Sequence, residues 1–180
     1  IVKTKTKIYF FDQKNKSFKV GAKKFIVKSN SSLIKIYKKK ISEVIIAIGD
    51  NEIRKKKFNI LKKNNFKFAT LIHPKAHLSY GSKIGQGSVV MQGTLINTDS
   101  IDHDCSIKDH THVCPGVIIA GNVKIGRNCW IGLGSKIIQN CVIGDNVFIG
   151  AGAVVTKNIK SNSFVKGIPA KYEKKKLAKL

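Results

Sequence analysis

The 180-residue sequence has no apolar run long enough to span a membrane and no signal-peptide pattern. These absences argue against membrane insertion and favour a cytoplasmic protein. Cysteine is also scarce, and no two of the four cysteines form a C-x-x-C pair. We expect these cysteines to be small core residues of a protein in a reducing compartment. We predict that they form neither a disulfide frame nor a metal site. They are Cys105, Cys114, Cys129 and Cys141.

Arginine is nearly absent, although the formal net charge is +24. Only Arg54 and Arg127 are arginines, and the other basic residues are lysines. Proteins that read nucleic acids favour arginine for bidentate contacts, so we do not predict a nucleic-acid partner. A lysine-rich surface instead creates a positive field that attracts anionic ligands such as sugar nucleotides and coenzyme A.

The sequence does contain a six-residue repeat. Neither a helix nor an ordinary strand has this period, so the repeat predicts a parallel β-helix in which three hexads close one triangular coil. The residue four positions after each anchor is nearly always small or β-branched and fits the space beside it. Each buried anchor contributes roughly 1.5–3 kcal/mol. The anchors are Ile107, Val113, Ile119, Ile125, Ile131, Ile137, Ile143, Ile149 and Val155.

Residues 1–72 do not follow the repeat and predict a small α/β unit. Strands are expected at 8–11, 44–48 and 66–72. A helix is expected from Asn51 to Asn64, capped by Asp50, with an apolar side formed by Ile53, Phe58, Ile60 and Leu61. Ligands of such units bind beyond the carboxyl ends of the strands, which here are Asp12 and the turn at 49–51.

Three parts follow from this organisation. Residues 1–72 form the α/β domain, residues 73–170 the β-helix, and residues 171–180 a basic tail or terminal helix. The stretch from His73 to His103 is short by roughly most of one coil, and the hexad beginning at Ile96 has only five residues.

Three hexads make eighteen residues, so residues eighteen apart should lie on one another. This rule places Gly121 on His103, Leu133 on Ala151, and His112 on Trp130. His103 and His112 are half a coil apart and lie on different faces, so a site that uses both needs two subunits. His103 stands between Asp102 and Asp104. An imidazole oriented by a carboxylate is a general base near neutral pH.

The motifs that carry a family resemblance span essentially the whole chain. They are Ile48–Arg54, Leu71–Pro74, Ile101–Cys105, Ala120–Gly126 and Gly167–Lys171. The chain resembles the sugar O-/N-acetyltransferases of the NeuD/PglD type. The resemblance implies a homotrimer of left-handed β-helices, each with an N-terminal Rossmann-like domain. It implies transfer of acetyl from acetyl-CoA to a sugar, often a nucleotide-linked amino sugar for bacterial surface glycans.

The resemblance also implies roles for individual residues. His103 would accept the proton, and Asp104 would raise its basicity. Acetyl-CoA would be bound through the thioester by His112 and Gly121 and through pantetheine by Leu133 and Ala151. The sugar nucleotide would be held by Asp12, Gly49 and Glu52. The backbone N–H of Gly121 would donate to the thioester oxygen.

Other interpretations remain open. The family's first strand and Gly-rich turn have no counterpart at Ile1, so the chain is either a fragment or has a compromised sugar-nucleotide pocket. A zinc-dependent hexapeptide carbonic anhydrase would need three histidine ligands from two subunits. His73, His77, His110 and His112 do not form that pattern. A third alternative is a trimeric scaffold that no longer turns over. The sequence leaves the sugar, the nucleotide and N- versus O-acetylation open.

Overall fold

The computed structural model describes residues 9–12, 17–20, 23–29, 38–97 and 105–173. The chain divides into two compact units, residues 1–42 and 43–180. The second unit therefore includes residues 43–72, which the sequence grouped with the N-terminal segment. Among the described residues, no helix is both long enough and apolar enough to cross a membrane.

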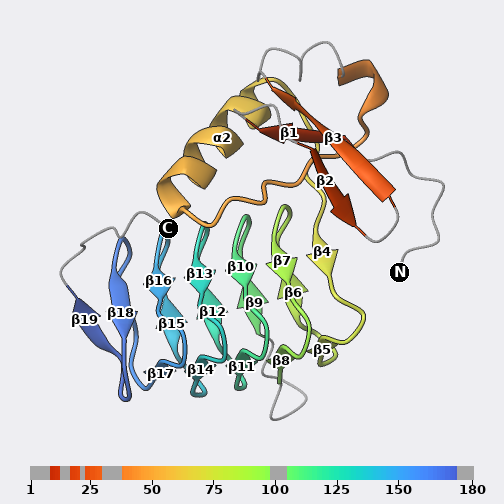
Figure 1. Ribbon diagram of the computed structural model, residues 1–180. Helices are drawn as coiled ribbons and strands as arrows, with labels where there is room; N and C mark the ends of the chain where they lie inside the picture. Colours follow the sequence, from red (N-terminus) through yellow and green to blue (C-terminus); the bar gives the residue numbers. More distant parts are fainter. Residues whose placement is uncertain (1–8, 13–16, 21–22, 30–37, 98–104, 174–180) are drawn as a thin grey trace. The chain divides into compact units, whose positions relative to one another are not determined.

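The first unit contains a three-stranded sheet and a short 3-10 helix, η1 (Lys38–Lys40). The strands are β1 (Phe10–Asp12), β2 (Ser17–Val20) and β3 (Lys23–Ser29), in the order β1-β3-β2 (Figure 1). β1 runs parallel to β3 and β2 runs antiparallel to it. The short strand expected to end at Asp12 is thus present.

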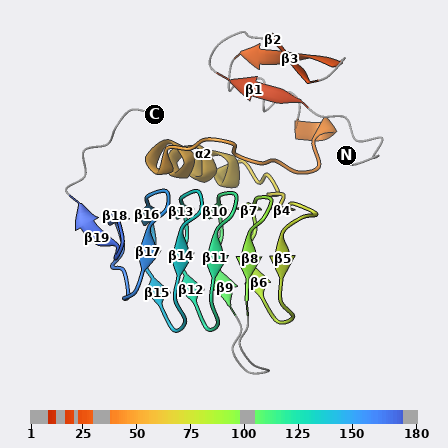
Figure 2. The ribbon, with the colours of Figure 1, turned by 60° about the horizontal axis from the view of Figure 1, so that its bottom comes forward.

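The second unit is a solenoid of short parallel strands arranged in three sheets (Figures 1 and 2). One sheet has the order β19-β18-β16-β13-β10-β7-β4, the second β17-β14-β11-β8-β5, and the third β15-β12-β9-β6. The strands are β4 (Leu71–Ile72), β5 (His77–Leu78), β6 (Lys83–Ile84), β7 (Val89–Val90), β8 (Leu95–Ile96), β9 (Ser106–Ile107), β10 (His112–Val113), β11 (Ile118–Ile119), β12 (Lys124–Ile125), β13 (Trp130–Ile131), β14 (Lys136–Ile137), β15 (Val142–Ile143), β16 (Phe148–Ile149), β17 (Val154–Val155), β18 (Phe164–Lys166) and β19 (Lys171–Glu173).

The repeat positions fill the interior as predicted. Each of the nine anchors is at most 2% exposed, because the second residue of each short strand points inward. The residues four positions later are buried as well, and so are all four cysteines, which are free thiols. The expected left-handed hexapeptide β-helix is confirmed.

The corners of the coils require a left-handed backbone, which Asn tolerates better than other non-glycine residues. Asn128, Asn146 and Asn162 all have φ close to +60° and occupy equivalent corners. Their side-chain amides form a ladder, with Asn128 donating to Asn146 (3.1 Å) and Asn146 donating to Asn162 (2.9 Å). His110 occupies the preceding position of this stack, with φ of 57°.

Paired residues are eighteen positions apart both before the connection from Ile96 to Ile107, as in Leu71–Val89, and after it, as in His112–Trp130. The last coil is shorter, and Phe148 pairs with Phe164, sixteen positions on. Pairs whose coil includes the connection from Ile96 to Ile107 are twenty-three positions apart, as in Leu95–Ile118. The rule of eighteen is therefore wrong across this segment. β8 and β9 are consecutive sides of one coil, and Ile107 lies eleven positions after Ile96. A single long corner between them therefore replaces the five-residue hexad expected at Ile96.

Helix α2 (Asn51–Lys63) lies against the solenoid within the second unit (Figure 2). Asp50 caps it as predicted, and its Oδ1 accepts from the backbone N–H of Glu52 (2.8 Å) and of Ile53 (2.9 Å). The predicted apolar side is only partly right. Leu61 is buried, but Ile53 and Ile60 are 48% and 55% exposed, and Arg54 is buried in their place.

The two strands expected around this helix are largely absent. Residues 44–48 form only a single parallel bridge, from Val44 to Phe68, and the predicted strand at 66–72 is reduced to β4. Ile46 is buried, because this segment covers the solenoid rather than extending a sheet. At the C-terminal end, β19 pairs antiparallel with β18, where a tail or helix was expected from residue 171.

Candidate active site

The predicted catalytic residues His103 and Asp104 lie outside the described residues. The main-chain hydrogen bonds between neighbouring coils are intact on either side of them. The N–H of Asn97 donates to the carbonyl of Ile119 (2.8 Å), and the N–H of Ser106 donates to that of Val123 (3.0 Å). Because the spacing here is twenty-three residues, stacking no longer supports a position of His103 directly on Gly121. The role of this pair stays a prediction.

Gly121 lies at the corner between β11 and β12. This corner and the long corner between β8 and β9 join the same two sheets of the solenoid. Gly121 is buried, and its carbonyl accepts a hydrogen bond from the N–H of Asn140 (3.0 Å). The long corner and Gly121 thus belong to the same edge of the solenoid, although no described contact joins them.

Leu133 and Ala151 stack as the repeat predicts. They follow β13 and β16, and the N–H of Gly152 donates to the carbonyl of Leu133 (2.8 Å). Leu133 is 57% exposed, so an apolar side chain faces solvent at this corner. Gly132 lets the two coils approach closely, because a Cβ there would lie 2.7 Å from the backbone nitrogen of Ala151. An exposed apolar row of this kind can line a groove for an extended ligand.

His112 is on β10 and stacks on Trp130, with ring centroids 5.6 Å apart. It is only 3% exposed. Burial lowers the pKa of His112 to about 4, with nearby Arg54 and His110 acting in the same direction, while a hydrogen bond to the backbone of Ile46 opposes the shift. His112 is therefore neutral at neutral pH, and its own chain covers it. The proposed contact of His112 with acetyl-CoA stays a prediction.

The structure brings two of the three predicted sugar-nucleotide residues together. Gly49 and Glu52 lie in the turn that begins α2, where a Cβ on Gly49 would be 3.6 Å from Cη2 of Trp130. Asp12 ends β1 in the other unit. The turn thus lies directly against the solenoid through Trp130.

Sequence reasoning missed Arg54, which is 1% exposed on α2. Burial lowers its pKa to about 10, while the nearby Cys129, Asp50 and Cys114 act in the opposite direction. The group still carries its charge at neutral pH. A lysine-rich helix offered no signal that its one arginine points inward, because the residue's partners are carbonyls and not a recognisable motif. Its Nη atoms donate to the oxygens of Ile48, Gly49, Asn51, Asn128 and Cys129.

His110 was considered only as a possible metal ligand. Its ring packs on Phe58, with centroids 3.5 Å apart, and on Phe68 at 4.9 Å. Burial lowers the pKa of His110 to about 4 against the opposing effect of Asp109, and the charges of Arg54 and Lys62 add to the lowering. His110 therefore joins α2 to the solenoid as a neutral aromatic side chain.

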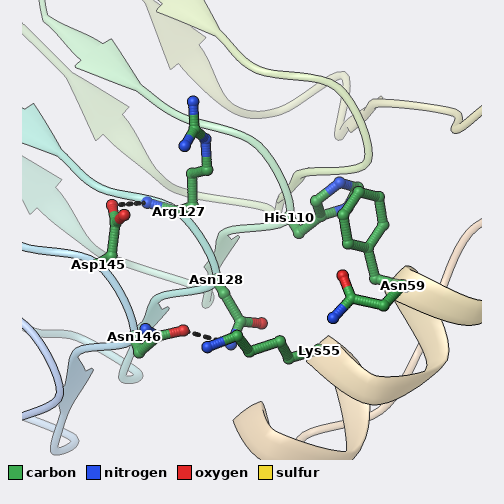
Figure 3. A pocket seen from close by; sticks show the side chains of 8 residues that line it. Lys55, Asn59, His110, Arg127, Asn128, Asp145 and Asn146 are labelled. Atoms are coloured by element: carbon green, nitrogen blue, oxygen red, sulfur yellow. Dashed lines mark hydrogen bonds between the residues drawn. The ribbon is translucent and has the colours of Figure 1, made fainter. Parts of the chain in front are cut away.

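A cavity of about 230 Å³ lies between α2 and the solenoid corners (Figure 3). Two of its lining residues have a buried polar atom without a hydrogen-bond partner, Nε2 of His110 and Oδ1 of Asn128. None of the predicted site residues lines this cavity. Its walls are formed by Lys55, Phe58, Asn59, His110, Arg127, Asn128, Asp145 and Asn146.

Among the described residues of this one chain, no three His, Cys, Asp or Glu side chains cluster. His73 accepts at Nδ1 from the N–H of Lys75 (3.0 Å). His110 and His112 both pack against aromatic rings.

Comparison with known proteins first defines the class. The family model "Bacterial transferase hexapeptide (six repeats)" matches residues 122–157, which lie in the solenoid. Together with the coil geometry, this match identifies a hexapeptide-repeat acyltransferase.

Further matches define the family within that class. The model of the PglD N-terminal domain matches residues 2–61. The acetyltransferase domain of PglB from Neisseria gonorrhoeae, solved with acetyl coenzyme A, is 32% identical with a TM-score of 0.72; the match covers 92% of this chain and 85% of that one. A point mutant of perosamine N-acetyltransferase from Caulobacter crescentus, solved with CoA and GDP-perosamine, is 28% identical with a TM-score of 0.69, over 84% of this chain and 79% of that one.

The chain belongs to the NeuD/PglD-type sugar acetyltransferases. It is an acetyl-CoA-dependent enzyme that acetylates a sugar, as the sequence predicted. The predicted family and activity are confirmed, while the individual site residues stay predictions.

Proposed function

We propose that the protein transfers acetyl from acetyl-CoA to the amine or hydroxyl of a nucleotide-linked sugar, with His103 as the base. One observation carries this proposal. The solenoid departs from its six-residue step once within β4–β17, between Ile96 and Ile107, and the acid-flanked histidine lies in that segment. The extra residues at this corner are not needed to stack the coils. Additional loop residues on a rigid scaffold are typical of a functional site.

The proposed reaction is a direct attack on the thioester. The sugar nitrogen or oxygen forms a bond to the acetyl carbon while its proton moves to the imidazole of His103. The carbon–sulfur bond then breaks, and coenzyme A leaves as a thiolate that takes up the proton from the imidazolium, which restores the base. The N–H of Gly121 would stabilise the oxyanion, and Asp104 would orient the imidazole. An acetyl-cysteine intermediate is disfavoured, because Cys105 is 1% exposed and its Sγ donates to two carbonyls.

The turn that begins α2 favours the nucleoside end of the ligand over its phosphates. A free helix N-terminus attracts phosphate. Here Asp50 already occupies the N–H groups of Glu52 and Ile53, and its carboxylate repels a second anion. Glu52 can accept hydrogen bonds from ribose hydroxyls or base amines beside Gly49. Asp12 belongs to the other unit, and its contact with the ligand stays a prediction. The perosamine enzyme was solved with a ligand of this class, GDP-perosamine.

We further propose that the enzyme works as a homotrimer in the bacterial cytoplasm. Leu133 and Ala151 lie at the corners between one pair of sheets, while Gly121 and the long corner lie between another pair. The two edges border different pairs of sheets, so a whole side of the solenoid separates pantetheine on the first edge from the second edge of the same subunit. A neighbouring subunit that supplies the second edge would complete the site.

The test is thiol release from acetyl-CoA in the presence of UDP-, GDP-, dTDP- and CMP-linked amino sugars. The H103A variant should lose at least about a hundredfold in kcat, the usual contribution of a general base, with coenzyme binding retained. The matched control is H77A, which removes an exposed histidine of β5. Full activity of H103A would overturn the assignment of the base. Binding of acetyl-CoA without turnover on any sugar would instead indicate a scaffold.

A further inference from the structure

We infer that Arg54 is a positioning residue that fixes the sugar-nucleotide turn against the coil leading to the acetyl-CoA groove. The inference rests on the proposed function of Gly49 and Glu52. It assigns to Arg54 no contact with either substrate.

The contacts of Arg54 extend in two directions. One Nη atom donates to the carbonyls of Ile48 (3.0 Å) and Gly49 (3.1 Å). The other donates to Oδ1 of Asn51 (2.7 Å) and to the solenoid carbonyl of Cys129 (3.1 Å). A fifth, longer contact reaches the carbonyl of Asn128 (3.4 Å). One planar guanidinium thus holds three residues of the turn and the corner that enters β13.

The buried guanidinium of Arg54 is not an efficient way to stabilise the folded protein. No carboxylate forms a salt bridge with Arg54 among the described residues, and burial of a charge costs several kcal/mol before its hydrogen bonds offset it. A packed apolar side chain would dock α2 at less cost. What the guanidinium adds is directionality, because its rigid fork fixes both the distance and the orientation between the two backbone segments.

The two segments lead directly to the two proposed half-sites. The turn contains Gly49 and precedes Glu52. On the solenoid side, Cys129 precedes β13, and Leu133 follows that strand by two residues. Because a displacement of about 1 Å between reactants can cost a hundredfold in rate, a rigid connection here would matter for catalysis.

Trp130 offers a direct optical probe of this connection. It is the only tryptophan in the sequence. The guanidinium carbon of Arg54 lies 5.8 Å from its ring centroid, and a Cβ added at Gly49 of the turn would lie 3.6 Å from the same ring. Movement of the turn should therefore change the indole fluorescence without any need for turnover.

The experiment compares R54K and R54A with the parent enzyme in the trimeric full chain. We expect the KM for the nucleotide sugar to rise about ten- to a hundredfold in both, the range for loss of hydrogen bonds from a charged group. The KM for acetyl-CoA should change less than twofold. Lysine should not rescue, because one ammonium cannot hold both segments. Millimolar guanidinium chloride should partly restore R54A, and urea should not.

Two controls separate positioning from general destabilisation. R127K alters the other arginine, which is exposed at a corner. L61A removes a buried side chain of α2 and should lower the melting temperature without a selective change in KM. The inference is wrong if L61A raises the same KM as much as R54A, or if R54A leaves both KM and Trp130 fluorescence unchanged while the parent is active. A parent that turns over no nucleotide sugar would instead refute the proposed function, and the fluorescence change in R54A would still test the connection.

Discussion

Replacement of Gly132 by alanine tests how closely the coils are packed at the proposed acetyl-CoA groove. A Cβ at this position would meet the backbone of the next coil, at the carbonyl oxygen of Ile149 and, 2.7 Å away, at the nitrogen of Ala151. Backbone cannot rotate aside as a side chain can. The coils must therefore separate, which weakens the bond from Gly132 to Ile149 (2.9 Å) and its neighbour from Trp130 to Val147 (2.9 Å).

The size of the effect follows from these contacts. Two weakened hydrogen bonds at about 1 kcal/mol each and overpacking of about 1–3 kcal/mol give a loss of about 3–5 kcal/mol. In a chain of this size, each kcal/mol lowers the melting temperature by about 2–4 °C. Gly134 is the matched control. It has φ of +63°, and a Cβ there meets nothing within 4 Å, so G134A carries only backbone strain of about 1–2 kcal/mol.

The assay is thermal unfolding of G132A and G134A at one fixed protein concentration, because assembly couples stability to concentration. We also expect a higher KM for acetyl-CoA in G132A, since Leu133 and Ala151 would separate with their coils. A G132A protein that is no less stable than G134A would refute the close packing on which this reasoning depends.

Three further predictions concern stability and reactivity. D50A removes the cap of α2 and should lower the free energy of unfolding by about 0.5–2 kcal/mol in denaturant titration, whereas D50N, which keeps a capping oxygen, should lower it less. The pKa of His110 is lowered to about 4 from 6.5, so the unfolded chain binds more protons between these values, and stability should fall as pH decreases from about 6.5 to about 4. H110N, which suits the left-handed corner, should flatten part of that slope in melts across pH; an unchanged slope would contradict the assignment. The four buried thiols should resist a thiol reagent until unfolding, and rapid labelling of the native protein would contradict their burial.

The solenoid was predictable because its signal is local and repeated. Each coil buries an aliphatic anchor and a small residue at fixed spacing, so the pattern from Ile107 to Val155 determines both the strands and their inward faces. The cap at Asp50 was equally readable, since capping depends on the residue itself and the next two N–H groups. These features need no knowledge of distant contacts.

The predictions that were wrong concern features that depend on contacts between residues far apart in the sequence. Ile53 and Ile60 were assigned to the buried side of α2 by hydrophobicity, yet Arg54 is buried, because its Nη atoms donate to carbonyls of the turn and of the solenoid. Similarly, the rule of eighteen could not detect that the step from Ile96 to Ile107 is one corner. Only the pairing of β8 with β11 and of β9 with β12 reveals it.

Part of the candidate site could be predicted from the local repeat of the solenoid. Leu133 and Ala151 follow from the repeat, and their stacking is as expected. His103 was identified by its acidic neighbours, a chemical signal that carries no information on position. Arg54 and the His110 contacts needed the structure, because each depends on a helix and a corner that are far apart in sequence.

The long corner between Ile96 and Ile107 interrupts the six-residue repeat without interrupting the main-chain bonds between coils. Main-chain bonds join Asn97 to Ile119 and Ser106 to Val123 whatever the length of chain between them. Evolution can therefore lengthen, shorten or rewrite that insert without disturbing the stack beneath it. A chain trimmed there by five residues would regain a uniform six-residue step and keep the same stack of coils.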